Sequence, residues 1–157
     1  MNTISKIIQE MGVVPVVVLN DAKDAKPLAQ ALCEGGLPCA EVTFRTEAAE
    51  ESIRLMTECY PDMFVGAGTV LTTEQVDRAV NAGAKALLID EDTSATNFMV
   101  RDELMQSVIA KDKEPITPFI DQARNLYKNQ GVSVILVAGS SGAYFHIADK
   151  VIQMDTY

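Results

Sequence analysis

The chain has 157 residues, of which 48% are apolar and 22% charged, and acidic residues outnumber basic ones by 22 to 13, giving a net charge of −9. This length and balance favour one globular domain with a sizeable core. The acidic charge argues against nucleic-acid and membrane-surface binding, because both require a basic face. The longest apolar run, residues 13–19, is too short to cross a membrane. We therefore expect a cytoplasmic protein.

The three cysteines and the single histidine show neither a disulfide framework nor a metal-binding pattern. Cys33 and Cys39 lack the two-residue spacing of zinc ligands, and Cys59 and His146 lie apart from them. We expect no metal and no cofactor.

Apolar runs alternate with helical patterns along the chain. The runs that predict strands are residues 13–19, 40–45, 63–70, 86–90, 133–138 and 151–155. Helices are predicted over 22–35, 47–59, 74–82, 101–110, 115–129 and 143–148, with Asp21, Thr46 and Thr73 as caps of the first three. Six strands separated by helices predict an α/β protein with a mainly parallel sheet. The repeat of roughly 23 residues over the first 85 positions is the rhythm of a (βα) barrel, and it lapses after residue 90.

Glu41, Thr43 and Arg45 alternate along the second predicted strand, so their side chains share one face. Arg45 lies near the carboxyl end of that strand, where α/β proteins place their sites. A carboxylate and a guanidinium there can serve as an acid/base with an anion clamp. They can equally form a structural ion pair, which composition alone favours.

Two glycine-containing segments follow strands. Residues 66–69 (Gly-Ala-Gly-Thr) and 139–142 (Gly-Ser-Ser-Gly) can present backbone N–H groups to an anion, or can be plain strand-to-helix turns. For the second segment the plain turn is favoured. A triad of Ser140, His146 and Asp149 is conceivable, but no nucleophile-elbow motif supports it.

Asp90 and Glu91 follow four apolar residues, as in a Walker B segment. There the aspartate would hold Mg²⁺ and the glutamate would polarise the attacking water. No Gly-Lys-Ser/Thr phosphate loop accompanies the pair. The alternative is a cluster of carboxylates at a strand end.

Residues 1–85 resemble the N-terminal half of 2-dehydro-3-deoxyphosphogluconate / 4-hydroxy-2-oxoglutarate aldolases, which are class I aldolases on a (βα)₈ barrel. The motifs that carry the resemblance are Val14–Val17, Ala40–Thr46, Val65–Leu71 and Ala82–Lys85. The resemblance implies Glu41 as the general acid/base, Arg45 as a contact to the substrate carboxylate, and Thr69 as a pocket residue. The family also has a Schiff-base lysine within a later apolar strand, and no lysine of this chain has that setting. Without that amine the iminium of a class I aldolase cannot form.

Residues 82–157 resemble a different family, the C-terminal part of the nucleotide-binding core in bacterial predicted ABC-class ATPases. The segments that carry this resemblance are 87–99, 101–103, 113–120 and 134–137. It implies Asp90 and Glu91 as the Walker B pair. The Walker A loop and the signature segment, which lie upstream in such proteins, are missing from this sequence.

The sequence thus predicts a chimera joined near residues 82–86, with 1–85 aldolase-like and 86–157 ATPase-like. Each part supplies whole βα units, which favours deliberate construction, or selection for folding, over an accidental fusion. We expect a single α/β domain over 1–157, with about six mostly parallel strands in a three-layer open sheet rather than a closed barrel. An exposed sheet edge would allow homo-oligomerisation.

The expected function follows from what each part lacks. At 157 residues the chain is shorter than the roughly 200 residues of a complete barrel. We expect no intact catalysis and a scaffold that carries remnants of two active sites. The alternatives are residual aldolase-type lyase activity or 2-oxo-acid binding through Glu41, Arg45 and Thr69, and weak Mg-nucleotide binding through Asp90 and Glu91.

Overall fold

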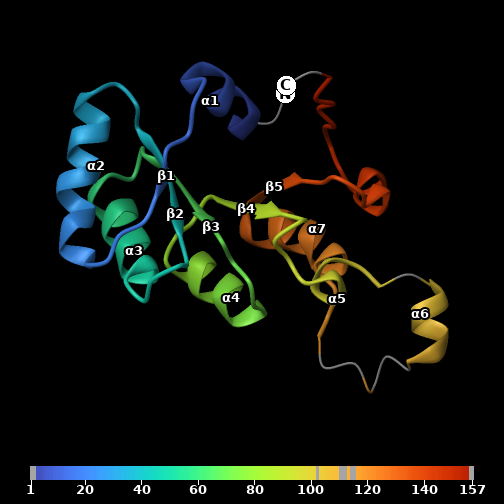
Figure 1. The fold of residues 1–157 in the computed structure, drawn as a ribbon. Helices are drawn as coiled ribbons and strands as arrows, with labels where there is room; N and C mark the ends of the chain where they lie inside the picture. The colour runs from blue at the N-terminus through green and yellow to red at the C-terminus, as the bar shows by residue number, and fades with distance from the viewer. Residues whose placement is uncertain (1–2, 102, 110–112, 114–115, 156–157) are drawn as a thin grey trace.

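Five parallel strands in the order β1-β2-β3-β4-β5 form an open sheet flanked by helices (Figure 1). The structure is a computed structural model that describes residues 3–101, 103–109, 113 and 116–155. Within these residues β1 and β5 do not pair, so the sheet does not close into a barrel. The predicted α/β class with an open, mainly parallel sheet is confirmed.

The bounds of the elements follow the predicted βα rhythm. The strands are β1 (Val16–Val17), β2 (Cys39–Thr43), β3 (Phe64–Gly68), β4 (Ala86–Asp90) and β5 (Ser133–Val137). The helices are α1 (Thr3–Met11), η1 (Ala22–Asp24), α2 (Ala25–Glu34), α3 (Ala49–Cys59), α4 (Thr73–Asn81), α5 (Thr96–Met99), α6 (Glu103–Val108), α7 (Phe119–Gln130) and η3 (Gly142–His146). None of these described helices is long and apolar enough to cross a membrane.

The two faces of the sheet are covered unequally. The larger core joins one face to α2, α3, α4 and α7, with strand residues such as Val42, Val65 and Leu87 fully buried. On the opposite face α1 packs over Cys39, Phe64 and Ala86, at the amino ends of the strands (Figure 1). The arrangement has three layers. On the sheet face that α1 covers, no described helix covers the half that lies towards the carboxyl ends of the strands.

The predicted sixth strand, residues 151–155, is wrong. The segment is without strand pairing in the structure, and Val151, Ile152 and Met154 are exposed. A β-branched, alternating run fits a strand but needs a neighbouring strand to pair with. After η3 the chain leads away from β5, so no such neighbour is at hand (Figure 1).

Two of the three predicted helix caps also differ. Asp21 accepts a hydrogen bond from the Lys23 backbone as expected. Thr46 instead donates its hydroxyl to the Leu19 carbonyl, so it ties two loops together rather than capping α3. Thr72, not Thr73, caps α4 by accepting from the Gln75 N–H.

Candidate functional site

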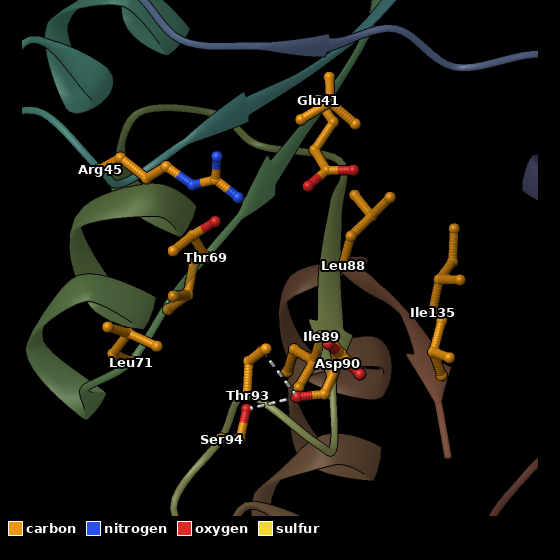
Figure 2. Close-up of a pocket in the computed structure, with 13 residues that line it drawn as sticks. Glu41, Arg45, Thr69, Leu71, Leu88, Ile89, Asp90, Thr93, Ser94 and Ile135 are labelled. Carbon is orange, nitrogen blue, oxygen red and sulfur yellow. Dashed lines mark hydrogen bonds between the residues drawn. The ribbon is translucent and has the colours of Figure 1, made fainter. Parts of the chain in front are cut away.

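A pocket of about 290 Å³ lies on the open face of the sheet, towards the carboxyl ends of β2, β3 and β4 (Figure 2). Its polar lining comes from one side chain within β2 and from side chains that end or follow the strands, namely Glu41 and then Arg45, Thr69, Asp90, Thr93 and Ser94. Its apolar lining includes Leu88, Ile135 and Val137. The structure thus brings the predicted Glu41, Arg45, Thr69 and Asp90 into one pocket. Thr93, Ser94 and Ile135 were not predicted, although the alternation along β5 points to Ile135.

The Glu41 side chain extends from the middle of β2 across the adjacent strand β3. Its side chain occupies the space beside Gly68, where an added Cβ would lie 2.6 Å from the Glu41 Cδ. Partial burial raises the pKa of Glu41 above its ordinary value, and the positive charge of Arg45 opposes this rise. No described residue donates a hydrogen bond to its carboxylate. A carboxyl group with a raised pKa and no hydrogen bond from the protein is of the kind that can exchange a proton with a ligand.

Arg45 follows the end of β2 in an ordered turn. The Phe44 N–H donates to the Gly68 carbonyl at 2.9 Å, and the Thr46 hydroxyl bonds to Leu19. The Arg45 side chain is exposed and extends towards Glu41 and Thr69 (Figure 2). Within the described chain no salt bridge joins it to a carboxylate, so the guanidinium is available to an anion.

Thr69 has a left-handed backbone conformation, with φ of +53°. A β-branched residue rarely adopts this region, and such strain concentrates at functional sites. The conformation turns the Thr69 hydroxyl towards Arg45 (Figure 2). Glu41, Arg45 and Thr69 therefore converge on one end of the pocket.

Glu91 lies apart from the pocket that Asp90 lines. One carboxylate oxygen accepts from the backbone N–H groups of Gly139, Ser140 and Ser141 at 2.8, 3.0 and 3.2 Å, and the other accepts from the Ser140 hydroxyl at 2.9 Å. These bonds, chiefly that from the Ser140 backbone, lower the pKa of Glu91. The loop after β5 thus holds an anion, and that anion is the side chain of Glu91.

The Ser140 hydroxyl and the Lys85 ammonium have structural partners. The Ser140 hydroxyl donates to Glu91, whereas at His146 it is the backbone carbonyl that accepts a hydrogen bond, from Arg124. Lys85 donates its ammonium to the Pro61 and Met63 carbonyls at 2.6 and 2.8 Å. In the described part of the chain no group of three or more His, Cys, Asp or Glu residues is arranged to hold a metal ion.

The carboxyl edge of an open parallel sheet is where α/β proteins place small-molecule sites, and the polar pocket of this chain lies at that edge. Residues 4–91 match the KDPG and KHG aldolase family, and residues 63–157 match the P-loop domain family of ABC ATPases. The chain belongs to the KDPG and KHG aldolase family over the first range and to the ABC ATPase P-loop family over the second. The two ranges overlap over residues 63–91.

The curated relatives are aldolases, and one of the matches is longer than the aldolase part. The chain is 36% identical over 133 residues to a 2-dehydro-3-deoxy-phosphogluconate aldolase of Haemophilus influenzae, covering 82% of this chain and 57% of the relative. It is 48% identical over 85 residues to the Treponema pallidum aldolase of the same name, covering 54% of this chain and 40% of that one. The chain spans about half the length of the curated relatives it matches.

A solved aldolase structure extends the likeness beyond the aldolase family match. The 2-keto-3-deoxy-6-phosphogluconate aldolase of Zymomonas mobilis, solved with 3-phosphoglycerate, superposes with a TM-score of 0.61 at 31% identity. The superposition covers 89% of this chain and 54% of that chain, so it continues past residue 91. The arrangement of the sheet and its helices is therefore aldolase-like.

Proposed function

We propose that the chain binds a small 2-oxo acid in its pocket and does not cleave it through a Schiff base. The observation that carries the proposal is the convergence of Glu41, Arg45 and Thr69 on one end of the pocket. Arg45 holds the ligand carboxylate, the Thr69 hydroxyl bonds beside it, and Glu41 meets the 2-oxo oxygen. The relatives that match this part of the chain are named as aldolases, which supports the choice of ligand class.

The side chains that β5 contributes to the pocket support binding of the 2-oxo acid rather than its cleavage. Ile135 and Val137 occupy the positions of β5 that face the pocket, and no described residue of the lining is a lysine. Lys85 uses its ammonium to hold two backbone carbonyls. A Schiff base needs an unprotonated amine within reach of the ligand carbonyl.

The two-family organisation is part of the proposal. We propose a chimera whose join lies near residues 82–86, between α4 and β4, so that each part contributes whole βα units. Pairing of β3 with β4 in parallel would then unite the two parts in one sheet. The three free cysteines support a reducing, cytoplasmic setting.

Titration of the ¹⁵N-labelled full chain with pyruvate tests the proposal. We expect saturable shifts of the Thr69, Val70 and Asp90 amides with a millimolar dissociation constant. Arg45→Gln should weaken binding about tenfold, because a charge-assisted hydrogen bond is worth roughly 1.5 kcal/mol or more.

Arg54→Gln is the matched control, because Arg54 is paired with Glu51 and Glu58 on α3 and does not line the pocket. It should leave the pyruvate affinity unchanged. Absence of saturable shifts, or equal loss of affinity in both variants, would refute pyruvate binding at this site.

A further inference from the structure

Asp90 gives the pocket a second charged end, away from Arg45. Strand register aligns Glu41 with Gly66 and Gly66 with Ala86, and Asp90 lies further along β4 towards the carboxyl edge. β4 is two strands from β2, a separation of about 10 Å across the sheet. The pocket therefore extends from Arg45, beyond β2, to Asp90 at the end of β4 (Figure 2).

The Asp90 carboxylate is exposed and forms no salt bridge with a described residue. It accepts a hydrogen bond of 3.3 Å from the Asp92 N–H. The hydroxyls of Thr93 and Ser94 donate to the Asp90 carbonyl at 3.3 and 2.8 Å, which leaves their oxygen lone pairs free to accept. This end of the pocket presents acceptors and one negative charge.

Apolar side chains form part of the pocket wall next to Asp90. Leu88 lies two residues before Asp90 on β4, and Ile135 is level with Leu88 on β5, the strand farther from Arg45. Leu88 is also level with Gly68, beside which the Glu41 side chain lies. A polar centre of a ligand would lose hydration against Leu88, whereas methylene groups would bury apolar surface there.

We infer that the pocket takes an extended carboxylic acid with a cationic nitrogen at its far end, with the carboxylate on Arg45 and the ammonium on Asp90. The inference deepens the proposed function and depends on it, because it uses the same Arg45 contact. Thr93 and Ser94 accept from the ammonium beside Asp90, and methylene groups cover Leu88. A spacing of about four methylene groups suits the two-strand separation.

Three acids that share four methylene groups test the inference on the full-length chain. 5-Aminopentanoate ends in an ammonium, hexanoate in a methyl group of similar size, and adipate in a second carboxylate. In titrations followed by NMR we expect the order of affinity 5-aminopentanoate, hexanoate, adipate, with about threefold to fivefold between the first two, as for an exposed ion pair.

Asp90→Asn should remove the preference for 5-aminopentanoate over hexanoate while leaving hexanoate binding in place. Asp92→Asn makes the same charge change two residues away, outside the pocket lining, and should retain the preference. Arg45-dependent binding of hexanoate without any preference for the amino acid would overturn this inference alone. Failure of all three acids to bind while pyruvate still binds would also overturn this inference alone, whereas failure of pyruvate as well would overturn the proposed function together with it.

Discussion

Glu41 is the residue whose protonation the pocket controls. Its pKa is raised, first by burial, with Arg45 opposing. As the pH falls from neutral towards the ordinary value of 4.5, Glu41 becomes neutral earlier than an exposed glutamate would. A neutral carboxyl group donates a hydrogen bond to a 2-oxo oxygen and no longer repels the pyruvate anion.

We therefore predict that pyruvate binds more tightly as the pH is lowered from 7 to 5, measured by titration at each pH. Glu41→Gln should bind with little dependence on pH over this range. The same raised pKa means that ionised Glu41 opposes folding above pH 4.5, so Glu41→Gln should be the more stable protein at pH 7. A wild-type affinity that rises with pH would contradict this role.

Gly68 makes room for the Glu41 side chain, since a Cβ at this position would lie 2.6 Å from the Glu41 Cδ. Gly68→Ala should displace the flexible carboxylate and lower pyruvate affinity at least severalfold, at a cost in unfolding free energy of about 1 kcal/mol. Urea unfolding and pyruvate titration measure the two effects separately. Gly142→Ala is the control, because an added Cβ there meets nothing within 4 Å; equal affinity in the two variants would argue against this packing role.

At the residue scale, the sequence predicts where side chains converge but not which hydrogen-bond partners they have. Alternation along β2 and the glycines of β3 place Glu41, Arg45 and Thr69 at one pocket. The partner of Glu91 lies nearly fifty residues away, in the loop after β5, so no local pattern indicates it. Thr46 likewise bonds to Leu19, on a separate loop, in place of its own helix.

The contact between Glu91 and the loop Gly139–Ser141 links the ends of β4 and β5. Its four hydrogen bonds favour the ionised carboxylate, which lowers the pKa of Glu91. A lowered pKa contributes stability that is present above the ordinary value of 4.5 and is lost as the pH falls through the folded-state pKa. The link is thus sensitive to acid.

We predict that Glu91→Gln lowers the melting temperature at pH 7 and that its difference from wild type shrinks below pH 4.5. Thermal unfolding by circular dichroism at several pH values measures this. Glu10→Gln, at an exposed position of α1, should melt like wild type at every pH. A difference in melting temperature between Glu91→Gln and wild type that grows as the pH falls would contradict this prediction.

At the element scale, the predicted bounds of β2, β3, β4 and β5 hold to within two residues. The bounds of β4 match the predicted 86–90, because both flanking strands pair with it. β1 shortens to Val16–Val17 from the predicted run 13–19, since it lies at the edge of the sheet and Pro15 has no N–H to donate. Residues 151–155 have the composition of a strand, but no neighbouring strand pairs with them in the structure.

At the scale of the whole molecule, the open sheet has two free edges within the described chain, at β1 and at β5. Val16 is 60% exposed and Val137 is 65% exposed, so both edges carry apolar side chains. Unpaired parallel edges favour pairing with a second copy. A twofold axis would place β5 of each copy beside β1 of the other and satisfy both edges at once.

We predict a concentration-dependent homodimer in analytical ultracentrifugation. Val137→Lys should shift it towards the monomer, because a lysine at a sheet edge opposes strand pairing. Leu104→Lys changes an exposed apolar residue on α6, away from both edges, and should leave the dimer unchanged. A monomer at all accessible concentrations, or an equal effect of the two variants, would exclude assembly through these edges.

We propose that the pocket combines a carboxylate-binding end at Arg45 with a β5 that presents Ile135 and Val137. On this proposal a 2-oxo acid binds without covalent attachment. Mass spectrometry of the intact protein, after borohydride reduction in the presence of saturating pyruvate, tests this most directly. We predict an unchanged mass; an increase equal to one reduced pyruvate, mapped to a lysine, would contradict it.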